Sequence, residues 1–151
     1  MALAAEPLAR QLATTKGSFY WHFKDVPAYQ EQLIGLWREH ALAQVSALLD
    51  RPTAADPSLR QFGRALLEDR AEAALRVWAQ SDPRVVAVLS EVDAARLSYL
   101  SDLLRQLGLG NPDFARALLA ALAGLPQVAP GDPATQIATF DTLVDTVLAL
   151  S

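Results

Sequence analysis

Few side chains in this 151-residue chain could carry out covalent or metal chemistry. Cysteine is absent, which excludes a disulfide framework, a thiolate metal site and a cysteine nucleophile. The two histidines, His22 and His40, stand 18 positions apart, far from the three- or four-residue spacing that places two histidine ligands on one helix face. Because no convergent set of acid, base and nucleophile can be assembled, we expect neither an enzyme nor a metal or cofactor site.

The acidic residues in the middle of the chain have a simpler explanation than catalysis. Glu72 and Arg76 have the spacing of an ion pair along one helix face. Interleaved arginines make a solvated charged face the expected setting of four carboxylates: Asp69, Glu72, Glu91 and Asp93. A ligand cavity is therefore a better expectation for this chain than an active site.

Composition and charge set the class of protein. Apolar residues make up 52% of the chain, but no run of them approaches the roughly 20 residues that a membrane-spanning helix needs. The net charge of −4 argues against a protein coated in basic residues for non-specific nucleic-acid binding. We expect a cytoplasmic protein without a membrane span, with one hydrophobic core and no second independent domain.

Proline and glycine divide the chain into helices. An Asp or Asn before a proline supplies a capping side chain and then a first-turn residue without an amide to satisfy, as at Asp56, Asp82, Asn111 and Asp132. Glycine tolerates the left-handed conformation that ends many helices, which gives stops at Gly108 and Gly110 and at Gly124 with Pro126. These signals predict an all-α fold with helices over residues 25–50, 57–80, 83–107, 112–124 and 133–150.

Apolar residues at helical spacing support these assignments. The predicted 57–80 helix places Leu59, Phe62, Val77 and Trp78 on its inner face. The last two helices are poorer in charge, with five charged side chains among residues 113–151 against sixteen among residues 51–112. We expect a second copy of the chain to cover them as a four-helix dimer interface over residues 112–151, and the alternative is a well-buried C-terminal helix in a monomer.

Residues 8–25 read LARQLATTKGSFYWHFKD, which is the pattern of a helix-turn-helix: a short helix, a polar turn near Ala13 and Thr14, and a second helix capped by Thr15. The nine-residue string from Gly17 to Asp25 resembles the end of the recognition helix and the start of the next helix in TetR-family (tetracycline-repressor-like) transcriptional regulators. The resemblance covers the remaining helices loosely. It implies a DNA-binding head over residues 1–24 and a helical body over residues 25–151.

The resemblance also assigns roles to the head residues. At the start of the recognition helix, Thr15, Lys16, Gly17 and Ser18 would reach base edges in the major groove of operator DNA. Contacts to the phosphate backbone would come from Tyr20, Trp21, His22 and Lys24. The alternative for Tyr20 and Trp21 is that they fill the core of the head, and His22 has an alternative as a capping or packing residue.

A ligand pocket within residues 50–124 is the second implication of the resemblance. Its occupation by a small effector would change the spacing of two heads in a homodimer and release DNA, as in a repressor. Large side chains of the middle helices are the candidates for its lining: Phe62, Trp78, Tyr99, Leu103 and Phe114. Few charges fall on those inward faces, so we expect an apolar or aromatic ligand with one or two polar anchors, among them the Tyr99 hydroxyl.

Two departures from the family pattern concern the head. Family heads begin with an amphipathic helix, whereas only Met1 to Glu6 precede the first helix here, so we expect an incomplete head. Ala13 stands where family members usually have a turn glycine. The alternative function is therefore a helical dimer that does not bind DNA and acts as a ligand-binding or interaction module.

Overall fold

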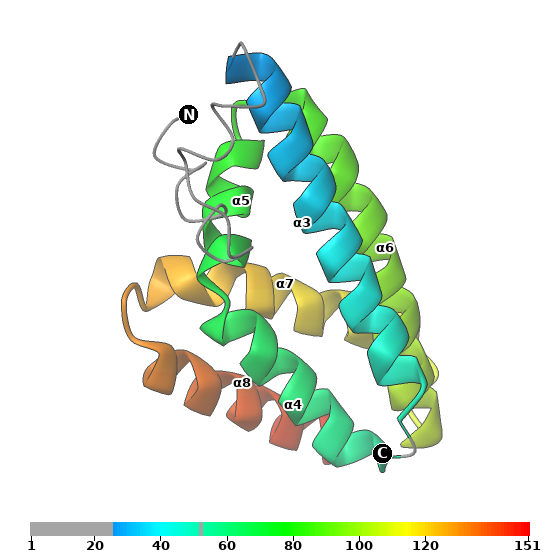
Figure 1. The fold of residues 1–151 in the computed structure, drawn as a ribbon. Coiled ribbons are helices and arrows are strands. Elements are labelled where there is room, and N and C mark those ends of the chain that lie inside the picture. Colours follow the sequence, from blue (N-terminus) through cyan, green and yellow to red (C-terminus); the bar gives the residue numbers. More distant parts are fainter. Residues whose placement is uncertain (1–25, 52) are drawn as a thin grey trace. The chain divides into compact units, whose positions relative to one another are not determined.

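The computed structural model describes residues 26–51 and 53–151, so the predicted head lies outside the described residues. The described part of the chain forms six α-helices and no strand, which confirms the all-α class for these residues (Figure 1). The helices are α3 (Val26–Leu49), α4 (Ala55–Glu68), α5 (Arg70–Ala79), α6 (Pro83–Gln106), α7 (Pro112–Val128) and α8 (Pro133–Leu148). Among the described residues, none of these helices has the length and apolar character to cross a membrane.

Three of the four predicted capping residues are confirmed. The side chain of Asp82 accepts a hydrogen bond from the Arg84 amide at 3.0 Å. Asn111 accepts one from the Asp113 amide, and Asp132 accepts one from the Thr135 amide. Each of them satisfies an amide that the first helical turn leaves without a partner.

The prediction that Asp56 caps α4 is wrong. The helix begins two residues earlier than predicted, at Ala55, and Ala54 stands at the capping position without a side-chain hydrogen bond. Asp56 lies inside the first turn, where its carboxylate accepts a hydrogen bond from Arg60 at 2.7 Å. The nearby arginine therefore offers this carboxylate a stronger partner than a backbone amide.

The prediction of one helix over residues 57–80 is also wrong. Asp69 adopts an extended conformation, with φ −85° and ψ 105°, and separates α4 from α5. Because of the break, α5 turns a different set of side chains inward than one continuous helix would. Its buried residues include Ala71, Leu75 and Trp78, whereas Val77 is 60% exposed. A single extended residue leaves no proline or glycine signal in the sequence.

The two predicted glycine stops behave differently. Gly108 has a φ of +83° and follows the end of α6, where the Leu109 amide reaches back to the Leu104 carbonyl at 2.8 Å, as predicted for a glycine stop. Gly124 and Pro126 do not end α7, which continues to Val128 with Pro126 inside it. Pro126 lacks the N–H that would bond to the Leu122 carbonyl, and the helix continues for only two residues beyond it.

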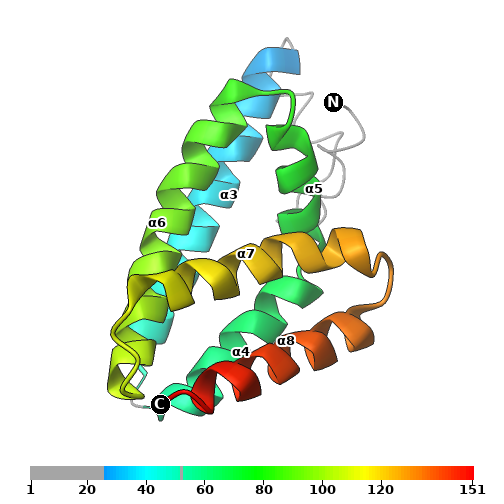
Figure 2. The ribbon, with the colours of Figure 1, turned by 180° about the vertical axis from the view of Figure 1, so that it is seen from behind.

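The described residues fall into two compact units, and the first holds residues 26–47 and Arg70–Asp93. It contains most of α3, all of α5 and the first half of α6; Figure 2 shows these segments from behind. Its core is one apolar cluster: Tyr29, Leu33, Ile34, Trp37, Ala41, Ala71, Leu75, Trp78, Val85, Leu89 and Val92.

The predicted ion pair of Glu72 and Arg76 forms in this unit, at 3.1 Å. Its expected position on a solvated face is wrong, because only 8% of the Glu72 side chain and 18% of the Arg76 side chain are exposed. Arg76 also contacts Asp93 of α6 at 2.9 Å, so one arginine joins carboxylates from two helices. The predicted solvated setting fits Glu91, which pairs with Arg38 on the surface.

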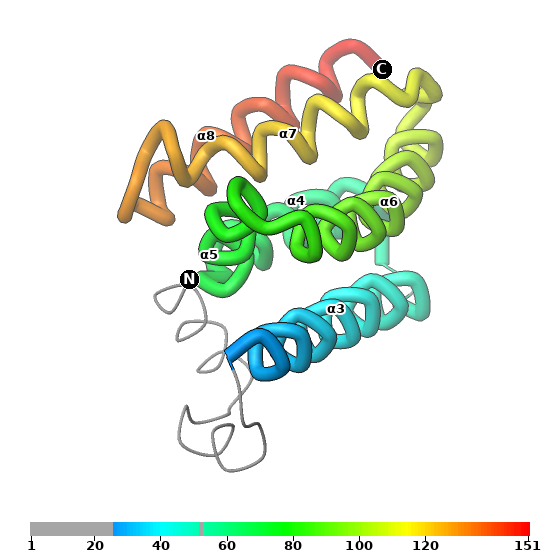
Figure 3. The backbone as a smooth tube through the Cα atoms, turned by 90° about the horizontal axis from the view of Figure 1, so that it is seen from above, coloured from blue at the N-terminus to red at the C-terminus, as the bar shows by residue number. Residues whose placement is uncertain are grey.

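The second unit holds Leu48–Asp69 and Ala94–Ser151. Within it α7 and α8 form an antiparallel hairpin, and α4 lies against both of them (Figure 3). Gly63 of α4 allows a close approach, because a Cβ at this position would overlap the ring of the fully buried Phe140 of α8. Arg60 adds a polar contact between the same helices through Asp145, at 2.6 Å.

Candidate ligand pocket

Of the two predicted sites, only the residues of the ligand site lie in the described part of the chain. All predicted DNA-binding residues lie outside the described residues: Thr15, Lys16, Gly17, Ser18, Tyr20, Trp21, His22 and Lys24. The candidate site among the described residues is a pocket in the second unit.

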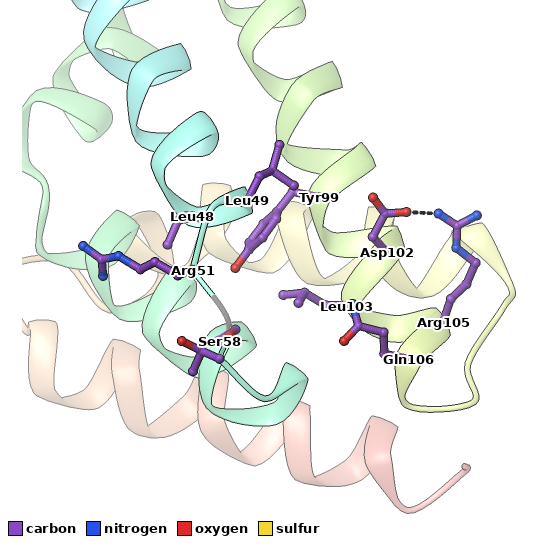
Figure 4. Close-up of a pocket in the computed structure, with 10 residues that line it drawn as sticks. Leu48, Leu49, Arg51, Ser58, Tyr99, Asp102, Leu103, Arg105 and Gln106 are labelled. Atoms are coloured by element: carbon purple, nitrogen blue, oxygen red, sulfur yellow. Dashed lines mark hydrogen bonds and ion pairs between the residues drawn. The ribbon is translucent and has the colours of Figure 1, made fainter.

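The pocket has a volume of about 420 Å³, within the range of roughly 300 to 1,000 Å³ that is typical of small-molecule sites. The end of α3, the connection to α4, the first turn of α4 and the last two turns of α6 surround it (Figure 4). Its lining residues are Leu48, Leu49, Arg51, Thr53, Ser58, Tyr99, Asp102, Leu103, Arg105 and Gln106.

Buried side chains form the inner part of the pocket. Tyr99 and Leu103 are 4% and 5% exposed, and Ser58 is 7% exposed. The ring of Phe62 packs against Tyr99, with the two ring centroids 5.6 Å apart and their planes tilted by 51°. Phe62 therefore helps to hold the Tyr99 ring, since tilted aromatic pairs at this distance attract each other.

Tyr99 is the most buried of the polar residues that line the pocket. Burial raises its pKa above the ordinary value, while a hydrogen bond with Ser58 and the charge of Arg51 act in the opposite direction. Tyr99 therefore stays neutral at physiological pH, and its hydroxyl can donate a hydrogen bond as well as accept one.

Charged residues form the outer part. Asp102 and Arg105, one turn apart on α6, make an ion pair with each other. Arg51 is exposed and makes no ion pair within the described residues. Two arginines and one aspartate line the pocket, which gives the lining a net charge of +1.

The five predicted ligand-binding residues do not all meet. Tyr99 and Leu103 line the pocket, and Phe62 contacts Tyr99 without lining it. Trp78 lies in the core of the first unit. Phe114 is half-buried on α7 and does not line the pocket.

Sequence reasoning missed most of the polar lining. The α6 residues Tyr99, Asp102, Leu103 and Gln106 follow the spacing i, i+3, i+4 and i+7, which places them on one helix face. That spacing is a signal that the sequence contains. The other polar residues of the lining come from the α3–α4 connection and the first turn of α4: Arg51, Thr53 and Ser58. No periodic pattern there indicates which way a side chain points.

The arrangement suits non-covalent binding, because it combines hydroxyl groups, an amide and a paired carboxylate with leucine side chains. Among the described residues, no group of three histidine, cysteine, aspartate or glutamate side chains could hold a metal ion. Comparisons with family models, with curated proteins and with solved structures find no match to this chain.

Proposed function

We propose that the protein is a ligand-responsive, DNA-binding transcriptional regulator of the TetR type, a repressor that a small molecule releases from its operator. The observation that carries the proposal is the position of α3. This 24-residue helix begins directly after the string Gly17 to Asp25, and its last two residues, Leu48 and Leu49, line the pocket. One helix would therefore follow the proposed DNA-reading motif in the sequence and line the proposed effector pocket with its last two residues.

A bound ligand would act by favouring one of two conformations of the regulator. It stabilises the conformation in which the pocket fits it best, and the affinity for DNA falls if that conformation positions the heads badly. Coupling of this kind typically changes affinity by roughly 5- to 150-fold. The contact of Leu48 and Leu49 with the pocket gives the ligand a physical link to α3.

Dimer formation through α7 and α8 is part of the proposal. Residues 117–131 carry no charge, and Ala117 and Ala120 expose small side chains on α7. Leu150, just beyond α8, is 66% exposed. Small residues allow another helix to approach closely, and an uncharged face costs little to remove from water.

Substitution at Ala120 tests the dimer. We expect Ala120→Glu to convert the dimer to a monomer, because a carboxylate at a closely packed interface would be desolvated without a partner. Ala87→Glu, at an exposed position of α6, is the matched control and leaves the dimer intact. Light scattering after gel filtration measures the mass, and a wild-type monomer would refute this part of the proposal.

DNA binding is tested by fluorescence anisotropy of the whole chain against its own upstream DNA and a scrambled duplex, over a range of salt concentrations. We expect tighter binding to the upstream DNA. Lys24→Gln should weaken binding to both duplexes and reduce the salt slope by roughly one. Arg64→Gln, which removes an exposed charge from α4, should leave the slope unchanged.

The same titration separates the proposal from its alternative. The pocket is built from residues 48–106 alone, so a ligand-binding module does not need the head. Equal, weak binding to both duplexes by a folded protein would contradict the regulator and favour the ligand-binding or interaction module.

A further inference from the structure

We propose that the pocket of the second unit binds a small amphipathic monoanion, a carboxylate on an apolar body, with the carboxylate held by Arg51 and the Tyr99 hydroxyl. The inference rests on the proposed function in taking this pocket as the effector site, and it adds the chemical class of the effector.

The charge of the lining favours an anion. Asp102 and Arg105 neutralise each other, and the remaining charge is that of Arg51. A guanidinium binds a carboxylate through two parallel hydrogen bonds, which is the strongest polar contact that this lining can offer. A cationic ligand would have to compete with Arg105 for the only carboxylate in the lining.

A hydrogen-bond donor lines the pocket on the same side as Arg51. In Figure 4 the Tyr99 hydroxyl is directed toward the side of the pocket on which Arg51 and Ser58 lie, and the Asp102–Arg105 pair lies at the other side. The Arg51 side chain itself extends away from Tyr99. Arg51 is close enough for its charge to act on the Tyr99 hydroxyl. Once the exposed Arg51 side chain turns toward Tyr99, a carboxylate at this place would accept hydrogen bonds from its guanidinium and from a neutral phenol.

Leucine side chains give the pocket an apolar wall for the body of the ligand. Leu48, Leu49 and Leu103 line the pocket together with the Tyr99 ring. Leu49 is 60% exposed, so an apolar ligand would remove its surface from water. The pocket is therefore polar at one side and apolar along its wall, which is the pattern of an amphipathic ligand.

Matched pairs of probes test the charge preference. The full-length protein is titrated by calorimetry with octanoate and 4-phenylbutyrate, and then with octanol and 4-phenylbutanol, which replace the carboxylate by a hydroxyl. We expect each acid to bind about fivefold more tightly than its alcohol at low salt. Added salt should reduce that difference, because Arg51 is exposed. The corresponding amine, 4-phenylbutylamine, should bind most weakly.

Three variants test which side chains cause the preference for the acid. Arg51→Gln should abolish the preference for the acid and leave the affinity for the alcohol unchanged. Tyr99→Phe, which removes one oxygen and keeps the ring on Phe62, should reduce the preference for the acid in part. The matched control is Arg64→Gln, which removes an exposed charge of the same unit that does not line the pocket and should retain the full preference.

The outcomes separate this inference from the proposed function, because the titration contains no DNA. Equal affinity for acid and alcohol, tighter binding of the amine, or no binding of any probe would overturn the inference. So would a preference that survives Arg51→Gln. An Arg51-dependent preference for the acids in a protein that does not distinguish its upstream DNA would uphold the inference and contradict the regulator.

Discussion

Asp82 combines burial, capping and ion pairing in one residue of the first unit. Its side chain is 5% exposed and accepts hydrogen bonds from the amide and the guanidinium of Arg84, the latter at 2.7 Å. The same guanidinium donates to Gln30 of α3 at 2.9 Å. The hydrogen bond from the Arg84 side chain is the main reason that the pKa of Asp82 lies below its ordinary value, with a smaller contribution from Trp78.

We predict that Asp82→Asn destabilises the fold in a pH-dependent way. Because the folded pKa is depressed, the ionised carboxylate stabilises the fold above its unfolded value of about 4, and this contribution is lost as pH falls through the folded pKa. Asparagine still caps a helix but cannot pair with Arg84, which is partly exposed, so the loss at pH 7 should be about 1 kcal/mol.

Urea denaturation of both proteins at pH 7 and pH 3 measures this difference. The difference in the free energy of unfolding should shrink at pH 3, where other carboxylates titrate equally in the two proteins. A difference that stays constant between the two pH values would contradict the assigned role of Asp82.

Gly63 is the second residue with a specific consequence. Gly63→Ala would drive a Cβ into the ring of Phe140, which is fully buried and cannot move aside, so we predict a loss of roughly 1 to 3 kcal/mol. Gly35→Ala is the control, because nothing lies within 4 Å of its Cβ position inside α3, and there alanine should stabilise by up to about 1 kcal/mol. Thermal melts that shift in the same direction for both variants would contradict this explanation.

The sequence predicts the structural role of Asp82 but not that of Gly63. Asp82 precedes a proline, and its capping role depends on its immediate neighbours, so the sequence indicates it. Gly63 is required by Phe140, a residue on another helix, and no local pattern connects them. Contacts between distant segments are set by packing, which the sequence reveals only through its periodic faces.

At the scale of the helices, Arg76 joins α5 to α6 through Glu72 and Asp93. Arg76→Gln would deprive two mostly buried carboxylates of this shared cation, and we predict a loss of roughly 2 to 4 kcal/mol. Arg38→Gln removes an exposed pair between α3 and α6 and should shift the denaturation midpoint little. Urea denaturation of both variants measures the free energy of unfolding. Equal losses in the two variants would contradict the prediction that the buried pairs of Arg76 stabilise the fold more than the exposed pair of Arg38.

The existence of the helices was easier to predict than their boundaries. Asp or Asn before a proline marks α6, α7 and α8 correctly, because each cap involves atoms only two or three residues apart. The break at Asp69 was missed, since an extended aspartate carries no sequence signal that distinguishes it from an aspartate within a helix. That one residue turned Val77 from a predicted core position into an exposed one.

At the scale of the molecule, the pocket brings together residues 48–58 and 99–106, which are far apart in the sequence. The sequence predicts Tyr99 and Leu103 as lining residues because they are large side chains at helical spacing. The same pattern groups Trp78 with them, although Trp78 belongs to the other unit. Periodicity predicts that a side chain faces inward, and the topology decides which core it enters.

If the pocket is the effector site, its occupation weakens binding to DNA. The most direct test is to measure the affinity of the chain for its upstream DNA by anisotropy, with and without saturating 4-phenylbutyrate, and the affinity for 4-phenylbutyrate with and without DNA. We predict that each ligand weakens the binding of the other by the same factor, because coupling between two sites is reciprocal. Two affinities that do not change in the presence of the other ligand would contradict the claim.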